Sequence, residues 1–280
     1  MWFAERADVG IVSADSRQLY RGFDIGTAKP SPAERARAQH YGVDVLEPTQ
    51  RASAAWWARS ADAWIDEIEA SGRLPLVAGG TGLYLRALFG PLFEEPPLDA
   101  ERRTALDGVL SSYPTETLRA WVQELDPIRS RLGRTQLLRA IEIALLTGHR
   151  VSALHESHRR PARRRARYLV IDPGPLLATA ITARTQAMMR GGWREEVRGL
   201  MQAVPGDAPA WNGTGYRTIR ALEQGLLSEA EAERQILVET RQYAKRQRTW
   251  FRHQLAGEHV TRLSTTQPDW AERAMAWWRE

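Results

Sequence analysis

The hydrophobic pattern of the N-terminal third alternates between short uncharged runs and stretches with helical spacing. Residues 9–12 and 74–78 are brief, apolar and bounded by polar residues or glycine, as buried strands are. A helix is predicted between Ser53 and Gly72, and a second one over residues 83–88. The first of these helices carries its apolar residues on one face: Trp57, Ala61, Trp64, Ile65 and Ile68. Strand, helix, strand, Gly-rich loop and helix in this order predict an α/β fold with a parallel sheet.

The pattern changes after residue 92. Residues 93–133 show helical periodicity interrupted by proline and glycine, and we interpret them as a helical insertion. The α/β core with its C-terminal helices is then expected to comprise residues 1–92 and 134–280. Residues 40–46 and 168–171 are the further strands that the pattern predicts for this core.

Two helices after the last predicted strand carry cations. Residues 176–189 form the first, and Arg184 is predicted to lie on its apolar stripe, where it needs an anion or must extend to solvent. The second opens with the capping box Ser228/Glu231 and runs to about residue 253. Its basic residues are spaced four, three and four positions apart: Arg241, Lys245, Arg248 and Arg252. A stripe without interleaved acids favours contact with an RNA backbone over a merely solvated face.

The composition, with 43% hydrophobic and 26% charged residues, is that of a soluble globular protein. The absence of cysteine excludes disulfides, thiolate metal sites and cysteine nucleophiles. No apolar run approaches the ~18 residues of a membrane span, and charges among the first residues are unlike a signal peptide. We therefore expect a cytoplasmic protein that makes no membrane contact.

The basic residues of the chain are almost all arginine. The net charge of +5 and the pI near 9.9 favour a polyanionic partner only weakly, but of the 39 basic residues only Lys29 and Lys245 are lysines. Both are candidates for sites where a compact ammonium cannot be exchanged for a planar guanidinium. The basic run 159–167 is equally compatible with a solvated loop and with an arm that contacts phosphates.

The residue most suggestive of chemistry is Asp15, which follows the first predicted strand within the stretch 13–20. Side chains at the carboxyl end of a strand in an α/β sheet face the crevice where ligands bind. For this stretch taken alone, the favoured interpretation is that Asp15 and Ser16 simply cap the next turn. The remaining motifs have to decide between these interpretations.

Six motifs, in this order, resemble those of the tRNA dimethylallyltransferase (isopentenyl-tRNA transferase) family. They are residues 11–20 with 26–30, residues 76–84 around Gly79-Gly80-Thr81-Gly82, residues 139–142, the helix of Arg184 and Met188, residues 213–217, and residues 240–251. Each motif alone is weak, but the set is highly specific and spans nearly the whole chain. Both lysines fall inside matched motifs.

The resemblance implies transfer of a dimethylallyl group from its diphosphate to the exocyclic amine of the adenosine 3′ of the anticodon in tRNA. It implies that Asp15 is the general base, that Thr81 lies at the diphosphate and the reacting base, and that Arg184 grips the phosphates. Mg²⁺ would bridge diphosphate oxygens, with no protein ligand assigned. The chain is expected to be a monomer. The residues implied to hold the tRNA anticodon stem-loop are Asp15, Ser16, Arg17, Gln18, Gln136, Arg139, Arg241 and Lys245.

One part of the family pattern has no match in these 280 residues: the first strand and its phosphate loop, Gly-x4-Gly-Lys-Ser/Thr. The resemblance therefore predicts an α/β fold with a P-loop-type parallel sheet core, a helical insertion and a helical C-terminal region, but with the first strand and P-loop missing. Because that loop supplies amides and a lysine to the diphosphate, we expect the chain as given to lack turnover. A start codon placed too far downstream is favoured over a truncated relic, since the later motifs are intact.

Two other functions stay open at this point. A P-loop-type small-molecule phosphotransferase would suit the α/β core and the Gly-rich loops, although it would not need the basic C-terminal helix. A catalytically dead tRNA-binding remnant would explain the missing loop.

Overall fold

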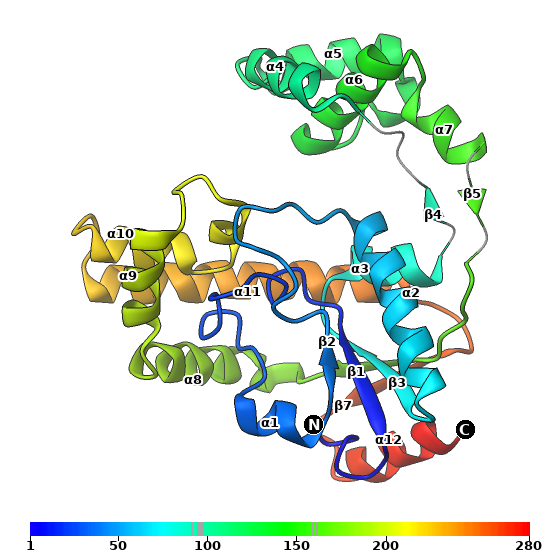
Figure 1. Cartoon of the computed structure of the whole chain (residues 1–280), viewed down its shortest axis with the longest axis vertical. Helices are drawn as coiled ribbons and strands as arrows, with labels where there is room; N and C mark the ends of the chain where they lie inside the picture. The colour runs from blue at the N-terminus through cyan, green and yellow to red at the C-terminus, as the bar shows by residue number, and fades with distance from the viewer. Residues whose placement is uncertain (91, 94–97, 158, 161) are drawn as a thin grey trace. The chain divides into compact units, whose positions relative to one another are not determined.

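The computed structural model describes residues 1–90, 92–93, 98–157, 159–160 and 162–280. It divides into two compact units, each described by itself (Figure 1). Unit 1 comprises Met1–Leu88 and Arg164–Glu280, and unit 2 comprises Phe89–Arg163. No helix in the described ranges is long and apolar enough to cross a membrane.

The centre of unit 1 is a three-stranded parallel sheet with the order β2-β1-β3. The strands are β1 (Val9–Ser13), β2 (His40–Tyr41) and β3 (Leu74–Ala78). All five residues of β1 are buried, as the uncharged run predicts. The α/β class and the parallel sheet are thus confirmed.

The strand expected over residues 40–46 is shorter in the structure, where β2 ends at Tyr41. The reason lies in the backbone, because Gly42 has φ +73° and Asp44 has φ +57°. Such left-handed residues interrupt a ladder. Beyond Tyr41, Leu46 pairs with Tyr20 in an isolated bridge outside the strands of the sheet.

Helices cover both faces of this sheet. On one face lies α2 (Ala54–Ala70), and a Cβ at Gly10 of β1 would fall 2.5 Å from Ile68 of that helix. On the other face, Val9 and Ile11 pack in a cluster with Trp278 of α12 (Trp270–Arg279) and with the first residues of the chain. The predicted apolar face of α2 is confirmed, with Trp57, Ala61, Ile65 and Ile68 buried and Trp64 half-buried.

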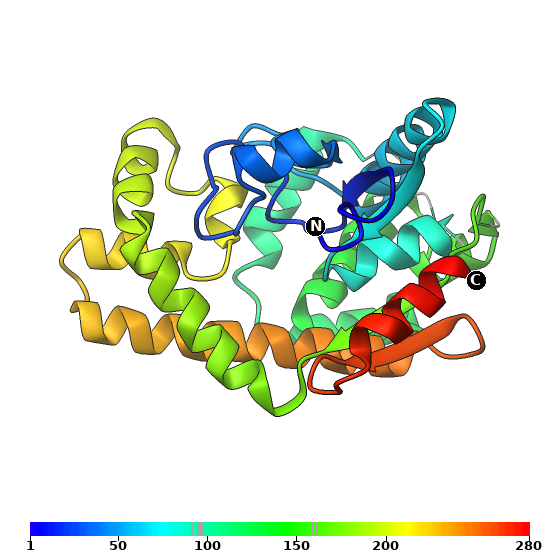
Figure 2. The ribbon, with the colours of Figure 1, turned by 90° about the horizontal axis from the view of Figure 1, so that it is seen from below.

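The rest of unit 1 contains a second parallel pair, β6 (Tyr168–Asp172) with β7 (Val260–Ser264), and mostly helices. The helix α11 (Glu229–Gln254) runs beside α8 (Leu177–Arg190) (Figures 1 and 2). It extends from the end of the unit that holds α10 (Tyr216–Glu223) toward the β6–β7 pair. The predicted capping box at its start is present, as Ser228 and Glu231 cap each other's backbone N–H groups. The other helices of unit 1 are α1 (Pro32–Arg37), α3 (Gly82–Phe89), η2 (Gly174–Leu176), α9 (Trp193–Ala203) and η3 (Pro209–Asn212). The last residue of α3, Phe89, belongs to unit 2.

Unit 2 is a helical unit with its own apolar core. Its elements are β4 (Leu92–Phe93), α4 (Ala100–Leu110), α5 (Thr115–Leu125), η1 (Pro127–Arg129), α6 (Arg134–Thr147), α7 (Val151–Ser157) and β5 (Arg159–Arg160), of which β4 and β5 pair antiparallel. The expected insertion, residues 93–133, lies within this unit, but the unit also holds residues 134–163. The boundary differs because Leu137 and Ile141 of α6 are fully buried against Leu118 and Val122 of α5.

Candidate functional site

Asp15 follows the end of β1, as predicted, and takes part in the turn after it. Its Oδ1 accepts a hydrogen bond of 2.8 Å from the backbone N–H of Arg17, so it does cap the turn. The carboxyl group is also half-buried, and this burial raises the pKa of Asp15. The Arg17 hydrogen bond and the positive charges of Arg17 and Arg184 only partly oppose that rise. A carboxylate so placed is a better proton acceptor than an exposed aspartate.

Thr81 lies beside the turn that contains Asp15, because β1 and β3 are neighbouring parallel strands. Ser13 of β1 pairs with Ala78 of β3, so the two following loops emerge side by side. The Thr81 N–H donates to the Ala14 carbonyl at 3.0 Å, and the Thr81 Oγ1 accepts from the Ser16 N–H at 3.0 Å. Thr81 is thus bonded to the residues on either side of Asp15, at the ends of two neighbouring strands.

The helix α11 closes this site with two residues that the sequence analysis missed. Gln247 donates from Nε2 to the Gly80 carbonyl at 3.1 Å, and Tyr243 hydrogen-bonds the Thr81 side chain. Burial first, and then the negative charge of Asp15, raise the pKa of Tyr243, which keeps its phenol protonated. The available signal was the spacing of Tyr243, Gln247 and Trp250 on one helical face.

Close packing of α11 explains the glycines of the loop after β3. A Cβ at Gly80 would lie 1.9 Å from the Gln247 amide, and a Cβ at Gly82 would lie 2.2 Å from the Trp250 ring. Neither position has room for a side chain. The backbone of Gly80 and Gly82 therefore packs directly against side chains of α11.

Replacing Gly82 by alanine is expected to lower the free energy of unfolding by about 1–3 kcal/mol, because the methyl group overpacks against Trp250. Urea titration followed by tryptophan fluorescence measures this change. The matched control is Gly199→Ala in α9, where a Cβ meets nothing within 4 Å. That control is expected to gain about 0.5–1 kcal/mol from helix propensity. A Gly82→Ala variant as stable as the wild type would contradict the packing.

Arg184 departs from its expected position. It was predicted on the apolar stripe of its helix, but the stripe is formed by the buried Ile181 and Thr185, and Arg184 is exposed. Its position is one step around the helix from Thr185, and its long side chain extends to solvent. Its charge nevertheless acts on Asp15 and lowers that pKa.

The predicted RNA-contacting segment has one residue that is engaged internally. Gln18 accepts from the Ser13 hydroxyl at 2.9 Å and donates from Nε2 to the carbonyls of Thr27 (3.3 Å) and Ala28 (3.1 Å). Ser16 and Arg17 are half-buried beside it. Gln136 and Arg139 lie on α6 in unit 2, where Arg139 pairs with the buried Glu142 at 2.7 Å.

The basic stripe of α11 is exposed along its length. Arg248 is ion-paired with Asp172 at 3.0 Å, whereas Arg241 and Lys245 have no ion pair within the described part of the chain. These two line a recess of about 500 Å³ between α8 and α11. The side chains of Arg241 and Lys245 in this recess are therefore available to bind an anion.

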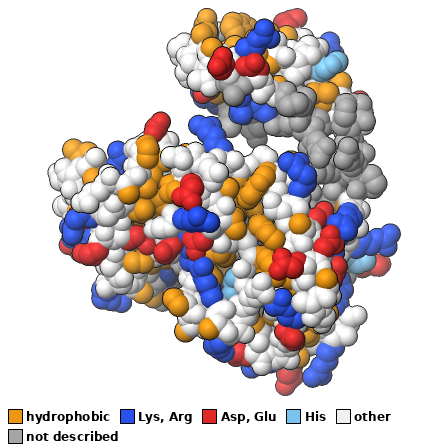
Figure 3. Space-filling view, viewed as in Figure 1, with side chains coloured by type: hydrophobic (Ala, Val, Ile, Leu, Met, Phe, Trp, Pro, Cys, Tyr) orange, Lys and Arg blue, Asp and Glu red, His pale blue; other side chains and the backbone are white. Residues whose placement is uncertain are grey.

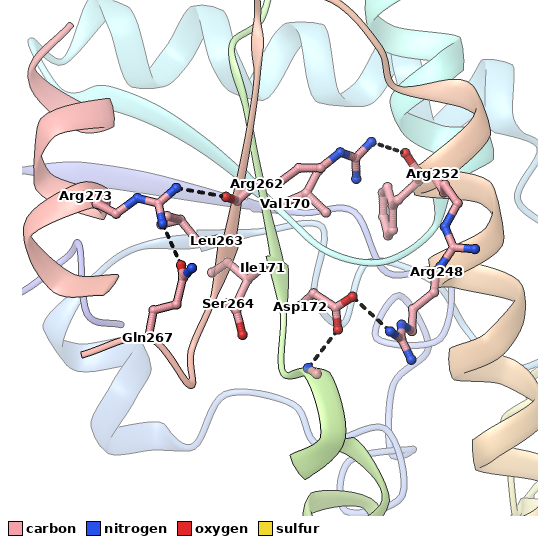
Figure 4. A pocket seen from close by; sticks show the side chains of 12 residues that line it. Val170, Ile171, Asp172, Arg248, Arg252, Arg262, Leu263, Ser264, Gln267 and Arg273 are labelled. Atoms are coloured by element: carbon pink, nitrogen blue, oxygen red, sulfur yellow. Dashed lines mark hydrogen bonds and ion pairs between the residues drawn. The ribbon is translucent and has the colours of Figure 1, made fainter. Parts of the chain in front are cut away.

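A neighbouring cavity of about 360 Å³ lies over β6 and β7 (Figure 4). Arg248 and Arg252 from α11, Arg262 from β7 and Arg273 from α12 line it. Arg262 is held by the Phe251 and Leu255 carbonyls, and Arg273 by Gln267 and the Arg262 carbonyl. Most of its cations are thus already engaged.

Two arginines of the basic run 159–167 are engaged by acidic side chains of the protein itself; Pro161 lies outside the described residues. Arg164 forms ion pairs with Asp62, Asp66 and Glu69, three acids on one face of α2. Arg167 lies 3.7 Å from Glu280 and over the Trp277 ring. On the face of unit 1 that Figure 3 shows, acidic and basic side chains are likewise interspersed. The run had no acidic partner in its own sequence neighbourhood, but the fold supplies one.

Metal binding has little support from the side chains. Across the described ranges, no group of three or more histidine or acidic residues could hold an ion. Near Asp15 the other oxygen ligands are the hydroxyls of Ser16 and Thr81. These residues do not form a protein cage for Mg²⁺.

Comparison with known proteins shows which family this chain resembles. The profile of the family described as IPP transferase matches residues 18–254. This chain belongs to the IPP transferase family. It is 42% identical over 255 residues to the tRNA dimethylallyltransferase of Anaeromyxobacter dehalogenans, covering 89% of this chain and 85% of the relative. It is 39% identical to the tRNA dimethylallyltransferase of Deinococcus radiodurans, covering 89% and 83%.

Solved structures agree with this assignment to the IPP transferases. The tRNA isopentenylpyrophosphate transferase of Bacillus halodurans superposes with a TM-score of 0.67 at 29% identity, over 98% of this chain and 88% of the other. A eukaryotic dimethylallyltransferase acting on tRNA gives a TM-score of 0.78 at 20% identity, over 98% and 73%, which supports the fold.

Proposed function

We propose that this IPP transferase moves a dimethylallyl group from dimethylallyl diphosphate to the exocyclic amine of the adenosine 3′ of the anticodon in tRNA. The observation that carries the proposal is that Thr81, which follows β3, is hydrogen-bonded to both chain neighbours of Asp15, which follows the adjacent parallel strand β1. The names of the relatives point to the same reaction. We also propose that the chain acts as a cytoplasmic monomer, since these groups come from one polypeptide.

In the proposed reaction, the adenosine amine attacks the first carbon of the dimethylallyl group. The carbon–nitrogen bond forms, the bond from that carbon to the diphosphate oxygen breaks, and the diphosphate leaves with the electron pair. The amine proton passes to Asp15 as general base, a type of assistance that contributes about 10²- to 10⁴-fold. The raised pKa of Asp15 suits this role, because a stronger base accepts the proton more readily.

The leaving diphosphate needs positive charge and hydrogen-bond donors. We assign these roles to Arg184, whose exposed guanidinium is free to turn toward the phosphates, and to the Thr81 hydroxyl. Mg²⁺, when bound, would neutralise charge on the diphosphate oxygens. It would be held by substrate and water rather than by a carboxylate cluster.

The tRNA is proposed to contact two surfaces of unit 1 and one helix of unit 2. The segment Asp15–Gln18 would hold the anticodon-loop nucleotides through Asp15, Ser16 and Arg17, with Gln18 fixing the segment. Arg241 and Lys245 would follow the phosphate backbone in the recess beside α8. Gln136 and Arg139 on α6 are the proposed contacts of unit 2. The target base has to leave its stack to reach Asp15.

The direct test incubates the extended chain, in which a strand and a Gly-x4-Gly-Lys-Thr loop precede Met1, with unmodified tRNA and labelled dimethylallyl diphosphate, followed by nuclease digestion and mass spectrometry. Label on an adenosine other than the one 3′ of the anticodon would contradict the proposed specificity. A tRNA that binds but never gains label would favour the binding remnant. Phosphoryl transfer to a small molecule would favour the phosphotransferase.

Turnover of the 280-residue chain is expected to be impaired, because none of its residues forms a Gly-x4-Gly-Lys-Ser/Thr loop. The comparison uses the extended chain, in which a strand and a Gly-x4-Gly-Lys-Thr loop precede Met1. Initial rates at equal concentrations are expected to be below detection for the 280-residue chain and measurable for the extended chain. Equal rates for the two forms would overturn this expectation.

A further inference from the structure

Lys29 is the most completely enclosed cation that the described residues show in an ion pair. Its side chain is 2% exposed. Its ammonium donates to the Tyr20 carbonyl at 2.5 Å, to Asp24 Oδ1 at 2.6 Å and to Asp44 Oδ1 at 2.5 Å. An ammonium has three protons to donate, so all of its donors are engaged inside the protein.

The three acceptors connect Lys29 to the segment that carries the proposed site. Tyr20 ends the stretch 13–20, and Asp44 donates from its backbone N–H to the Gln18 carbonyl at 3.1 Å. Asp44 is itself fixed, because Arg35 pairs with its other oxygen at 2.7 Å. Burial would raise the pKa of Asp44, but hydrogen bonds from Lys29 and Arg35 hold it below its ordinary value. The contacts of Lys29 therefore pin the backbone at Tyr20 directly and at Gln18 through Asp44.

The loop that carries Lys29, residues 24–29, is anchored from the far side. Glu196 of α9 accepts from the N–H groups of Asp24 (3.0 Å) and Ile25 (2.7 Å). The Tyr216 hydroxyl accepts from the Gly26 N–H at 3.1 Å and donates to Glu196 at 2.7 Å. This gives a structural role to the Gly213–Arg217 motif, which no step of the reaction uses. These hydrogen bonds fix the loop 24–29, from which the Lys29 side chain extends to the stretch 13–20.

Amino-acid usage gives an independent reason to single out this side chain. Only two lysines remain in a chain with 39 basic residues. Three acceptors around one nitrogen in an enclosed space suit a compact ammonium, whereas a planar guanidinium is larger and points its donors along a fork. Arginine would be a poor substitute at this position.

We propose that Lys29 is a positioning residue: it holds the segment Asp15–Gln18 in the conformation that receives the tRNA. The proposal rests on the proposed function for its consequence in catalysis. Its structural content, that the segment loses order without the ammonium, stands separately.

The first experiment needs no activity and uses the 280-residue chain. Amide hydrogen exchange, read by mass spectrometry, compares the wild type with Lys29→Arg and with the surface control Arg37→Lys. Peptides covering residues 13–21 are expected to exchange at least tenfold faster in Lys29→Arg, and at the wild-type rate in the control. Unchanged exchange in these peptides would overturn the proposal.

The second experiment measures kinetics in the extended chain. Lys29→Arg is expected to lower kcat/KM for tRNA at least tenfold, with the KM for dimethylallyl diphosphate unchanged within twofold. A rise in the KM for dimethylallyl diphosphate as large as the loss for tRNA would indicate general damage to the fold and overturn the positioning role. A wild-type extended chain that transfers nothing would instead refute the proposed function. The hydrogen-exchange experiment would still test whether Lys29 orders the segment Asp15–Gln18.

A third comparison separates positioning from charge balance. Lys29→Met leaves Asp24 without its cation and Asp44 with Arg35 alone, an excess of one negative charge that adding Asp24→Asn removes. The double variant is expected to recover much of the melting temperature lost in Lys29→Met, but not kcat/KM for tRNA, because the contact with the Tyr20 carbonyl is still missing. Recovery of both quantities would mean that Lys29 only neutralises charge.

Discussion

Replacing Asp15 by asparagine in the extended chain is expected to lower kcat for dimethylallyl transfer by about 10²- to 10⁴-fold, the usual contribution of a general base. The amide keeps the shape of the carboxylate and can still accept from the Arg17 N–H, so the turn is preserved. Affinity for tRNA, measured by filter binding, is expected to stay within about twofold. The loss would then lie in proton transfer rather than in binding.

The control for this variant is Asp207→Asn, which changes an exposed aspartate outside the site. It is expected to transfer at the wild-type rate. Substantial transfer by Asp15→Asn would show that another group accepts the proton. Loss of tRNA affinity in parallel with kcat would show that Asp15 mainly holds the RNA.

Replacing Arg184 by glutamine is expected to raise the KM for dimethylallyl diphosphate by about 10- to 100-fold, because a hydrogen bond between charged groups contributes about 1.5–3 kcal/mol. A second effect follows from the electrostatics. The Arg184 charge lowers the pKa of Asp15, so its removal lets burial raise that pKa further. Because the base acts in its deprotonated form, the rate rises as pH increases through this pKa. The acid limb of the pH–rate profile is therefore expected to lie above an ordinary aspartate and to move upward in the variant.

The matched control for Arg184 is Arg190→Gln, another exposed arginine on the same helix α8. It is expected to change neither the KM nor the acid limb. A higher KM without a shift of the acid limb would place Arg184 at the diphosphate but away from Asp15. An unchanged KM would contradict its assignment to the phosphates.

Much of the architecture could be predicted because its signals are local. The strands β1, β3 and β6, the helix α2 and the capping box of α11 follow from apolar runs, helical spacing and a four-residue cap. The limits of the inserted unit could not be read in this way. Leu137 and Ile141 have the same pattern whether they pack on the sheet or, as the structure has it, on α5.

The candidate site likewise has features that the local sequence predicts and features that it does not. The sequence determined that Asp15 follows a strand and that a Gly-Gly-Thr-Gly loop follows another, and parallel pairing then brings these strand ends together. It also singled out Lys29, through the near absence of lysine, but gave no partner for it.

Only the tertiary structure decided which distant groups meet. Gln247 contacts a glycine 167 positions earlier, Arg164 finds its acids on α2 about 100 positions away, and Lys29 has two carboxylates and a carbonyl around one nitrogen. The physical reason is that periodicity reports whether a side chain is buried, whereas hydrogen bonds and ion pairs depend on distances of a few ångströms between atoms far apart in the chain. Those distances are fixed by packing of whole elements, which no single segment encodes.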